Sequence, residues 1–458
     1  MPHLASLVRA VRLSCTAPIH RTLAFTASAR SGSHLLGLYP QPNITFTHGF
    51  QSTLFDANGN SYLDFNSGIA VNALGHGDPD VVAAVTDQAP KLIHLSNLYA
   101  NEHGAKAAEL LVDSVIGKDA SRQTWWGSSA KVFFCNSGTE ANEASIKFAR
   151  KYARENNRTA TGILSFTHAF HGRSMGALSA TPNLKYQAPF APLVPGFVTS
   201  EYNNAQALDA VDWSQICGVI VEPMQGEGGV FPAKKEFLAK LRAKCDEVRA
   251  LLIFDEIQCG IGRSGRMYMH HCLEESNTCQ NCEFTSTGAC TGMGVNPDLL
   301  SLAKPLANGI PMGAVVLTQR VAAHIKPGDH GTTFGGGPLA TRVAGVVLAK
   351  VARPTFLAHV RGVSNMLFER LRAFLAKFPG VVKEVRGRGL LVGMELHAGV
   401  NVSEFVELAL KKGNVLAISA GQNTVRLAPP LVITHAEVER ACNVFEEVLV
   451  ELAAKEKK

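Results

Sequence analysis

The stretch from residue 251 to residue 304 constrains the fold of this chain most strongly. It opens with the apolar run Leu-Leu-Ile-Phe at 251–254, which ends in Asp255, and it closes on a second apolar run at 299–303, which ends in Lys304. A short apolar run closed by a charged residue predicts a buried parallel strand with that residue at its carboxyl end. Because ligands of open α/β sheets bind at those ends, we expect Asp255 and Lys304 to share one pocket.

A carboxylate and an amine in one pocket are the two groups that pyridoxal phosphate requires. Lys304 would bind this cofactor covalently, and Asp255 would keep the pyridine nitrogen protonated so that the ring can accept electrons. Each residue also has a commoner role, since a lone lysine usually extends its amine to solvent and an aspartate often caps a helix or a turn. The surrounding motifs favour the cofactor interpretation.

Three of these motifs resemble the class III, ornithine-type aminotransferases. They are Leu-Leu-Ile-Phe-Asp-Glu-Ile-Gln at 251–258, Gly-Ile-Gly-Arg-Ser-Gly at 260–265 and Leu-Ala-Lys at 302–304. The resemblance extends over residues 40–450, with the separate motifs in the order that the family has them. Several motifs in order are a specific signal.

The resemblance implies an α/β fold of the PLP-dependent transferase fold type I. Its large domain would have a mostly parallel, seven-stranded sheet, its smaller domain would be α+β, and two copies would form a homodimer with shared active sites. The segment 68–76 is similar to family members that transfer an amino group from N-acetylornithine to 2-oxoglutarate, which yields glutamate. Ornithine or 4-aminobutyrate as the amino donor is the alternative within the family.

A candidate phosphate site lies at residues 136–139, where Asn-Ser-Gly-Thr separates an expected strand from an expected helix. Ser137, with Glu140 three residues later, fits a capping box. The free N–H groups of such a helix start can bind phosphate, although a cap without a ligand is more frequent. The family uses this turn for the cofactor phosphate, and the resemblance therefore assigns Ser137, Gly138 and Thr139 to the cofactor.

The same resemblance assigns further residues to the cofactor and the substrate. Phe170 would stack on the cofactor ring, and Gln258 would also contact the cofactor. Arg173 would bind a substrate carboxylate through its planar guanidinium. His171 is a less favoured candidate for a general base, because in this chemistry the lysine itself moves the proton.

The remaining assignments concern substrate carboxylates and the second subunit. Glu227, in a glycine-rich loop, would gate the substrate arginine, and Arg426 would bind an α-carboxylate. Thr332 would lie near the substrate, and Thr333 would reach the cofactor phosphate of the partner subunit. All four assignments are implied by the resemblance. The structural alternative for Glu227, together with Glu222 at the preceding strand end, is a solvated loop pair, and that for Arg426 is a surface strand arginine.

Residues 260–265 also satisfy the pattern G-x-G-x-x-G of dinucleotide-binding proteins. That interpretation requires the pattern to form the first strand-to-helix turn of a βαβ unit. Here the acidic turn at 255–258 intervenes, and the pattern lies beyond the middle of the chain. We therefore treat it as a chance match.

Residues 268–294 depart from the family pattern, and a Cys-x-x-Cys within them could bind zinc together with nearby cysteines. The cysteines concerned are Cys272, Cys279, Cys282 and Cys290. Because the second pair is irregularly spaced, we expect a surface insertion without a metal. With Pro305 in place of the family's usual glycine, the insertion also motivates an alternative from another class, a zinc-binding or regulatory protein on an inactive aminotransferase scaffold.

The N-terminus indicates a mitochondrial address. Residues 1–50 contain no acidic residue, and four arginines lie among the first 30. An acid-free, serine-rich segment with arginines is typical of a mitochondrial transit peptide, which predicts the matrix as the location. Removing those arginines lowers the formal net charge from +6 to about +2, so nucleic acid is not an expected partner. Since apolar runs stay below ~18 residues, no membrane span is expected.

We predict four parts from these patterns. They are a transit peptide at 1–33, an N-terminal segment of the small domain at 34–84, a large cofactor-binding domain at 85–345 with the insertion 268–294, and a C-terminal small domain at 346–458. The N-terminal segment is expected to contain a β-hairpin at 52–65. Residues 121–130, which combine two tryptophans with small polar residues, are predicted to form a loop.

Overall fold

The computed structural model describes residues 34, 36–39, 42–271 and 295–456 of the chain. It consists of two compact units, residues 1–44 and 45–458. The described residues of the first unit form no helix or strand, and all elements below belong to the second. The predicted transit peptide at 1–33 lies outside the described residues, as do Cys272, Cys279, Cys282 and Cys290.

A seven-stranded sheet forms the centre of the second unit, with the order β4-β12-β11-β10-β7-β5-β6. Neighbouring strands are parallel except that β12 runs against both of its neighbours, which confirms the predicted fold class. The strands are β4 (Lys131–Cys135), β5 (Gly162–Phe166), β6 (Phe197–Ser200), β7 (Ile216–Val221), β10 (Leu251–Asp255), β11 (Leu299–Leu302) and β12 (Gly313–Leu317).

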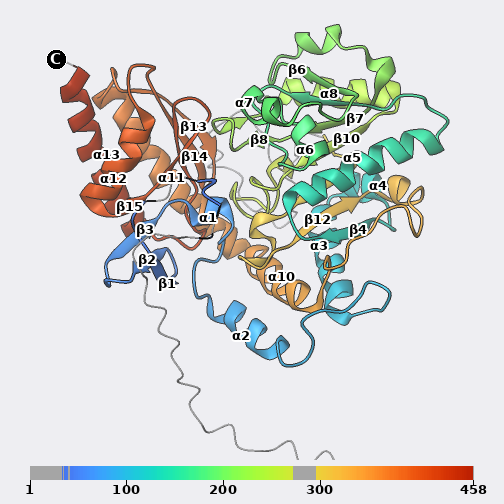
Figure 1. Ribbon diagram of the computed structural model, residues 1–458, viewed down its shortest axis with the longest axis horizontal. Helices are drawn as coiled ribbons and strands as arrows, with labels where there is room; N and C mark the ends of the chain where they lie inside the picture. The colour runs from blue at the N-terminus through green and yellow to red at the C-terminus, as the bar shows by residue number, and fades with distance from the viewer. Residues whose placement is uncertain (1–33, 35, 40–41, 272–294, 457–458) are drawn as a thin grey trace, which may run out of the picture. The chain divides into compact units, whose positions relative to one another are not determined.

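The central strand β10 shows why this sheet has a core on both faces. Because side chains alternate along a strand, Leu251 and Ile253 face one way and Leu252 and Phe254 the other. The first pair belongs to a core beneath α5 (Gly138–Glu155), and the second pair to a core that includes α8 (Lys235–Val248). Figure 1 shows α5 and α8 beside the strands they cover.

The two ends of the chain share a separate core and two smaller sheets. One sheet has the order β1-β2-β3-β15 and the other β13-β14-β17-β16. Their elements are β1 (Phe46–Phe50), β2 (Thr53–Asp56), β3 (Ser61–Asp64), β13 (Val382–Arg388), β14 (Leu391–Leu396), β15 (Val415–Leu416), β16 (Ile418–Ala420) and β17 (Thr424–Leu427), with helices α11 (Pro354–Lys377), α12 (Val402–Gly413) and α13 (His435–Glu456). In Figure 1 the blue N-terminal strands accordingly lie beside the red C-terminal elements.

The predicted N-terminal hairpin is confirmed by the antiparallel pairing of β2 and β3. Asp56 shapes its turn, because its Oδ1 accepts the backbone N–H groups of Asn58 and Asn60 at 2.9 and 2.8 Å. Strand β1, which precedes this hairpin and pairs with β2, was not predicted.

The loop predicted at 121–130 is wrong over most of its length. Residues 120–126 form helix α4 (Ala120–Trp126). Asp119 caps it by accepting the N–H groups of Ser121 and Arg122, and Trp126 is fully buried. The aspartate cap and the burial of Trp126 therefore stabilise a helix here, despite the small polar residues that predicted a loop.

The remaining elements connect these layers. They are α1 (Ser67–Ala70), α2 (Pro79–Gln88), α3 (Glu102–Ile116), α6 (Met175–Ser179), α7 (Leu184–Gln187), α9 (Gln319–Ala322), α10 (Pro338–Val351), β8 (Met224–Gln225) and β9 (Phe231–Pro232). The predicted boundaries at 84 and 345 fall within α2 and α10, and they stay predictions.

No single helix in the described ranges is long and apolar enough to cross a membrane; α10 and α11 meet that criterion only as a pair bent by 68°.

Candidate active site

A cavity of about 380 Å³ lies where several strands of the large sheet end. Its walls come from the segments that follow β4, β5, β7, β10 and β11, as expected for a sheet whose strands end at a common edge. Asp255 and Lys304 both line it, so the structure brings together the two residues that the sequence placed in one pocket. The other predicted residues in its wall are Ser137, Gly138, Thr139, Phe170, Arg173 and Gln258.

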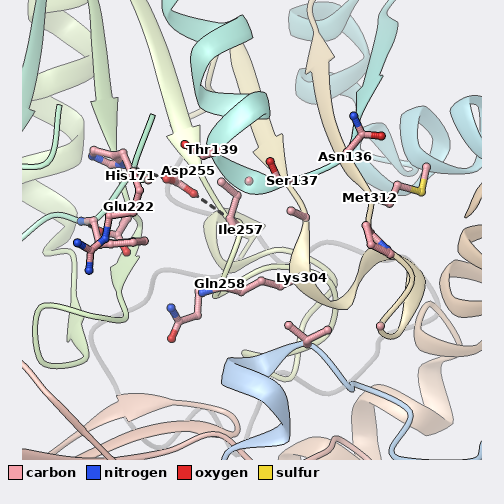
Figure 2. A pocket seen from close by; sticks show the side chains of 18 of the residues that line it. Asn136, Ser137, Thr139, His171, Glu222, Asp255, Ile257, Gln258, Lys304 and Met312 are labelled. Carbon is pink, nitrogen blue, oxygen red and sulfur yellow. Dashed lines mark hydrogen bonds and ion pairs between the residues drawn. The ribbon is translucent and has the colours of Figure 1, made fainter. Parts of the chain in front are cut away.

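Asp255 is buried and held from three directions. Its Oδ2 accepts from Asn142 Nδ2 at 2.7 Å and lies 2.8 Å from His171 Nδ1, while its Oδ1 accepts the N–H of Ile257 at 3.1 Å. Figure 2 shows the carboxylate between His171 and Ile257. Three polar contacts around one carboxylate fix its orientation.

His171 and Asn142 therefore position Asp255. With a carboxylate beside Nδ1, the imidazole carries its proton there, and the buried Nε2 has no hydrogen-bond partner among the described residues. Asn142, which sequence reasoning missed, is fully buried on α5. The sequence does place this amide among the apolar residues that the helix buries against the sheet. Because a buried amide needs polar partners, that position could have indicated a role in the site.

Lys304 begins a short 3₁₀ turn, which Ala303 separates from the end of β11. Its φ is 39°, in the left-handed region that costs a non-glycine residue about 1 kcal/mol or more and is typical of functional sites. Pro305, the next residue, is buried within the same turn. Burial, followed by the positive charge of Arg426, lowers the pKa of Lys304 to about 8.

The predicted phosphate site is the start of the long helix α5. Ser137 caps the helix by accepting the N–H of Glu140 at 3.3 Å. The capping box is only half formed, because Glu140 Oε2 accepts from Asn136 instead of from the N–H of Ser137. The first N–H groups of a helix lack intrahelical acceptors and can bind phosphate. Glycine at 138 lets Ile257 pack against this helix start, because a Cβ there would lie 2.8 Å from the Ile257 side chain.

Two arginines adjoin the cavity in different ways. The guanidinium of Arg173 lies over the ring of Tyr186 at 3.7 Å, and it is exposed to the cavity. Arg426 is 2% exposed and lies behind Gln258, to whose Oε1 its Nη1 donates at 3.1 Å. Its Nη2 pairs with Glu227 Oε2 at 3.0 Å, so the two predicted substrate residues Arg426 and Glu227 form an ion pair.

The two threonines lie outside the cavity wall. Thr332 is close to it, because its Oγ1 accepts from Asn136 Nδ2 at 3.1 Å and Asn136 lines the cavity. Thr333 is exposed. Its predicted contact with the cofactor of a partner subunit stays a prediction.

Glu222 differs from the solvated loop residue that was its structural alternative. It follows β7, lines the cavity and is 4% exposed. Its Oε1 accepts the N–H of Phe170 at 3.0 Å, and its Oε2 accepts the N–H of Gly226 at 3.1 Å. Burial raises the pKa of Glu222 to about 7, and His171 opposes that shift.

These groups fit pyridoxal phosphate. The cavity has the size of a small-molecule site. It contains an amine of lowered pKa, a buried carboxylate fixed by three donors, and a helix start that can bind phosphate. Over the described ranges of the chain, no three His, Cys, Asp or Glu side chains are grouped as a metal site would require.

Comparisons with known proteins agree with this site. A family model described as Aminotransferase class-III matches residues 39–277 and 281–449. The chain is 44% identical to the mitochondrial acetylornithine aminotransferase of Yarrowia lipolytica, over 90% of this chain and 92% of that one. It is 43% identical to succinylornithine transaminase of Yersinia pseudotuberculosis, over 88% and 92%.

A solved structure of ornithine aminotransferase from Toxoplasma gondii has PLP at the active site in partial occupancy. It matches this structure with a TM-score of 0.79 and 30% identity, over 93% of this chain and 94% of that chain.

Proposed function

From the premise that the chain belongs to the class III aminotransferases, we propose that it is an acetylornithine aminotransferase. The reaction transfers the δ-amino group of N-acetylornithine to 2-oxoglutarate and yields N-acetylglutamate 5-semialdehyde and glutamate, a step of arginine biosynthesis. The observation that carries the proposal is 44% identity, over 90% of this chain, to a relative with that name. The chain uses pyridoxal 5'-phosphate, as its family does.

When bound, pyridoxal phosphate supplies an electron-accepting ring that carries the amino group from one substrate to the other. Lys304 holds the cofactor between turnovers. During turnover its Nζ moves a proton at the substrate carbon that bears the amino group. A pKa of about 8 gives Lys304 a larger neutral fraction near neutral pH than an ordinary lysine has. Asp255, fixed by Asn142 and His171, would be the carboxylate that keeps the pyridine nitrogen of the bound cofactor protonated.

The Arg426–Glu227 ion pair supports a reaction with two differently oriented substrates. N-acetylornithine reacts through its distal amine, so its α-carboxylate lies far from the reacting carbon. Glutamate reacts through its α-amine, so its α-carboxylate lies beside that carbon. When Glu227 moves away from Arg426, Arg426 binds the α-carboxylate of glutamate. Arg173 binds the distal carboxylate of either substrate.

A second candidate donor is N-succinylornithine, because the chain is almost equally identical to a succinylornithine transaminase. Initial rates with 2-oxoglutarate and each of N-acetylornithine, N-succinylornithine, ornithine and 4-aminobutyrate separate these possibilities. We expect the highest kcat/KM for N-acetylornithine. A higher kcat/KM for ornithine or 4-aminobutyrate than for both acylated donors would overturn the proposal. Failure of all four donors would instead favour an inactive scaffold.

We also propose that the chain works as a homodimer. Large apolar side chains are exposed on the segment 93–99 and on the loop 332–335 that it contacts. They are Ile93 (60%), Leu98 (87%) and Tyr99 (68%) on the segment and Phe334 (65%) on the loop. Asn97 Nδ2 ties the two together by donating to the carbonyl groups of Thr332 and Gly335 at 3.0 Å. An apolar surface of this kind is typical of a subunit interface. Light scattering after size exclusion should give twice the chain mass, and a monomer would contradict the proposal.

The mitochondrial matrix is the proposed location. The acid-free segment at 1–33 supports it, and the Yarrowia lipolytica relative is named as a mitochondrial protein. A fluorescent protein fused behind residues 1–33 should co-localise with a matrix marker. Diffuse cytoplasmic fluorescence would contradict the assignment.

A further inference from the structure

The loop that carries Glu227, residues 226–229, is fixed along its backbone; we call it the gate loop. Its first N–H, at Gly226, donates to Glu222 Oε2 at 3.1 Å. The carbonyl of Glu227 accepts the N–H of Gly421 at 2.8 Å. At the other end, the carbonyl of Gly229 accepts from Arg386 Nε at 2.9 Å. Strands β8 and β9, which pair with each other, flank the loop.

Close packing restricts the gate loop further. A Cβ at Gly226 would clash with the side chain of Gln258, and a Cβ at Gly228 would clash with the carbonyl of His168. The loop backbone therefore contacts its neighbours directly, and it cannot shift towards them without displacing them. Glycine is required at both positions for this approach.

The side chain of Glu227 has the freedom that the backbone lacks. It is 33% exposed, whereas its partner Arg426 is 2% exposed and is also held by Gln258. Glu227 lines a second cavity of about 400 Å³, whose wall includes Asn183, Lys185 and Gln422. When the Glu227 carboxylate leaves Arg426, it can therefore turn into this polar cavity, whose wall includes the positively charged side chain of Lys185.

Glu222 is the residue that connects the gate loop to the active site. Its two oxygens each accept one backbone N–H, from Phe170 on one side and from Gly226 on the other. A carboxylate can accept both bonds, while the amide of a glutamine would direct its NH₂ group at one of these two donors. Glu222 thus spans the segment that contributes Phe170 to the cavity and the loop that carries Glu227.

We propose that Glu222 is a positioning residue, which together with Arg386 fixes the gate loop so that Glu227 makes and breaks its ion pair with Arg426 by rotation of its side chain alone. The assignment of Glu227 as a gate rests on the proposed function, but the anchoring of the loop does not. Without the anchor, Glu227 would mask Arg426 less well. The half-reaction with the acylated donor, which needs the masked arginine, would then be impaired.

The first test measures the loop itself. In hydrogen–deuterium exchange of the purified holoenzyme, Glu222→Gln should speed exchange of the amides at 226–229 by roughly 10-fold, because the hydrogen bond that Gly226 donates to Glu222 is lost. Glu236→Gln, an exposed glutamate on α8, is the matched control and should leave these amides unchanged. Wild-type exchange in Glu222→Gln would overturn the proposal whatever the substrate is.

The second test separates positioning from general damage. In single-turnover half-reactions, Glu222→Gln should raise the N-acetylornithine concentration that gives the half-maximal rate by about 10-fold. The 2-oxoglutarate concentration that gives the half-maximal rate should change by less than about 3-fold. Equal losses in both half-reactions would indicate a merely structural role and overturn the proposal. If Glu222→Gln does not fold, Arg386→Lys tests the other anchor, since lysine cannot reproduce its contacts with Gly229 and Thr424 together. Unchanged loop exchange in that variant would also overturn it.

Discussion

Replacing Arg426 by lysine should separate the two half-reactions. The guanidinium uses two nitrogens, Nη2 towards Glu227 at 3.0 Å and Nη1 towards Gln258 at 3.1 Å, and it does so from a buried position. A lysine keeps the charge but not the planar fork, so it cannot hold Gln258 and a carboxylate in the same geometry. The substitution therefore removes the fork and leaves the local charge unchanged.

The magnitude follows from the contact that is lost. A fork between arginine and a carboxylate contributes roughly 1.5–3 kcal/mol, which corresponds to about 10- to 100-fold in binding. That loss should fall on the half-reaction with 2-oxoglutarate, whose α-carboxylate binds Arg426. The half-reaction with N-acetylornithine, whose carboxylate binds Arg173, should change by less than about 3-fold, because lysine keeps a positive charge that can pair with Glu227.

Single-turnover kinetics of each half-reaction, followed by the cofactor absorbance, measures both effects. Arg440→Lys is a suitable control, because this arginine lies exposed on α13 and donates to a backbone carbonyl. Equal losses in the two half-reactions of Arg426→Lys would refute the selective role of Arg426. A larger loss with the acylated donor would reverse the assignment of the two arginines.

Three further outcomes are expected. Lys304→Ala should abolish both transamination and the absorbance of the covalently bound cofactor, and turnover near the wild-type rate would place the catalytic amine elsewhere. The rate at which cofactor-free protein takes up pyridoxal phosphate should rise with pH through about 8, because only the neutral amine reacts and burial lowers the pKa of Lys304 to about 8; a rise confined to the range near 10.5 would contradict this. Metal analysis of the purified protein should find no stoichiometric zinc in the insertion 268–294, and zinc whose chelation unfolds the protein would revive the metal interpretation.

The sheet and the centre of the site were accessible from the sequence because their signals are local. The apolar runs before Asp255 and Lys304 predict buried strands, and parallel strands place their ends at one edge. Both strands, and the shared cavity, occur as predicted. The turn at 136–139 was likewise recognisable from its residue types, although the structure shows that Glu140 bonds Asn136 rather than closing the capping box.

The contacts that tune the site were not accessible, because they join residues far apart in the chain. Asn142 bonds Asp255 across 113 residues, and helical periodicity shows only that Asn142 lies on a buried face. Glu222 bonds a glycine four residues away and the N–H of Phe170, 52 residues away, and no pattern distinguishes it from a solvated loop acid. Only the fold determines which distant donors meet these side chains.

The pairing of the two chain ends has a consequence for how the protein is made. Asn414 Nδ2 donates to the carbonyl of Ser61, 353 residues earlier, and β15 pairs with β3 at the edge of the N-terminal sheet. A ribosome adds about 5–20 residues per second, so the N-terminal strands wait on the order of 20 to 70 s before their partners exist. During that time the apolar side chains of these strands lack a core, so the strands stay accessible to cellular factors that bind unfolded polypeptide.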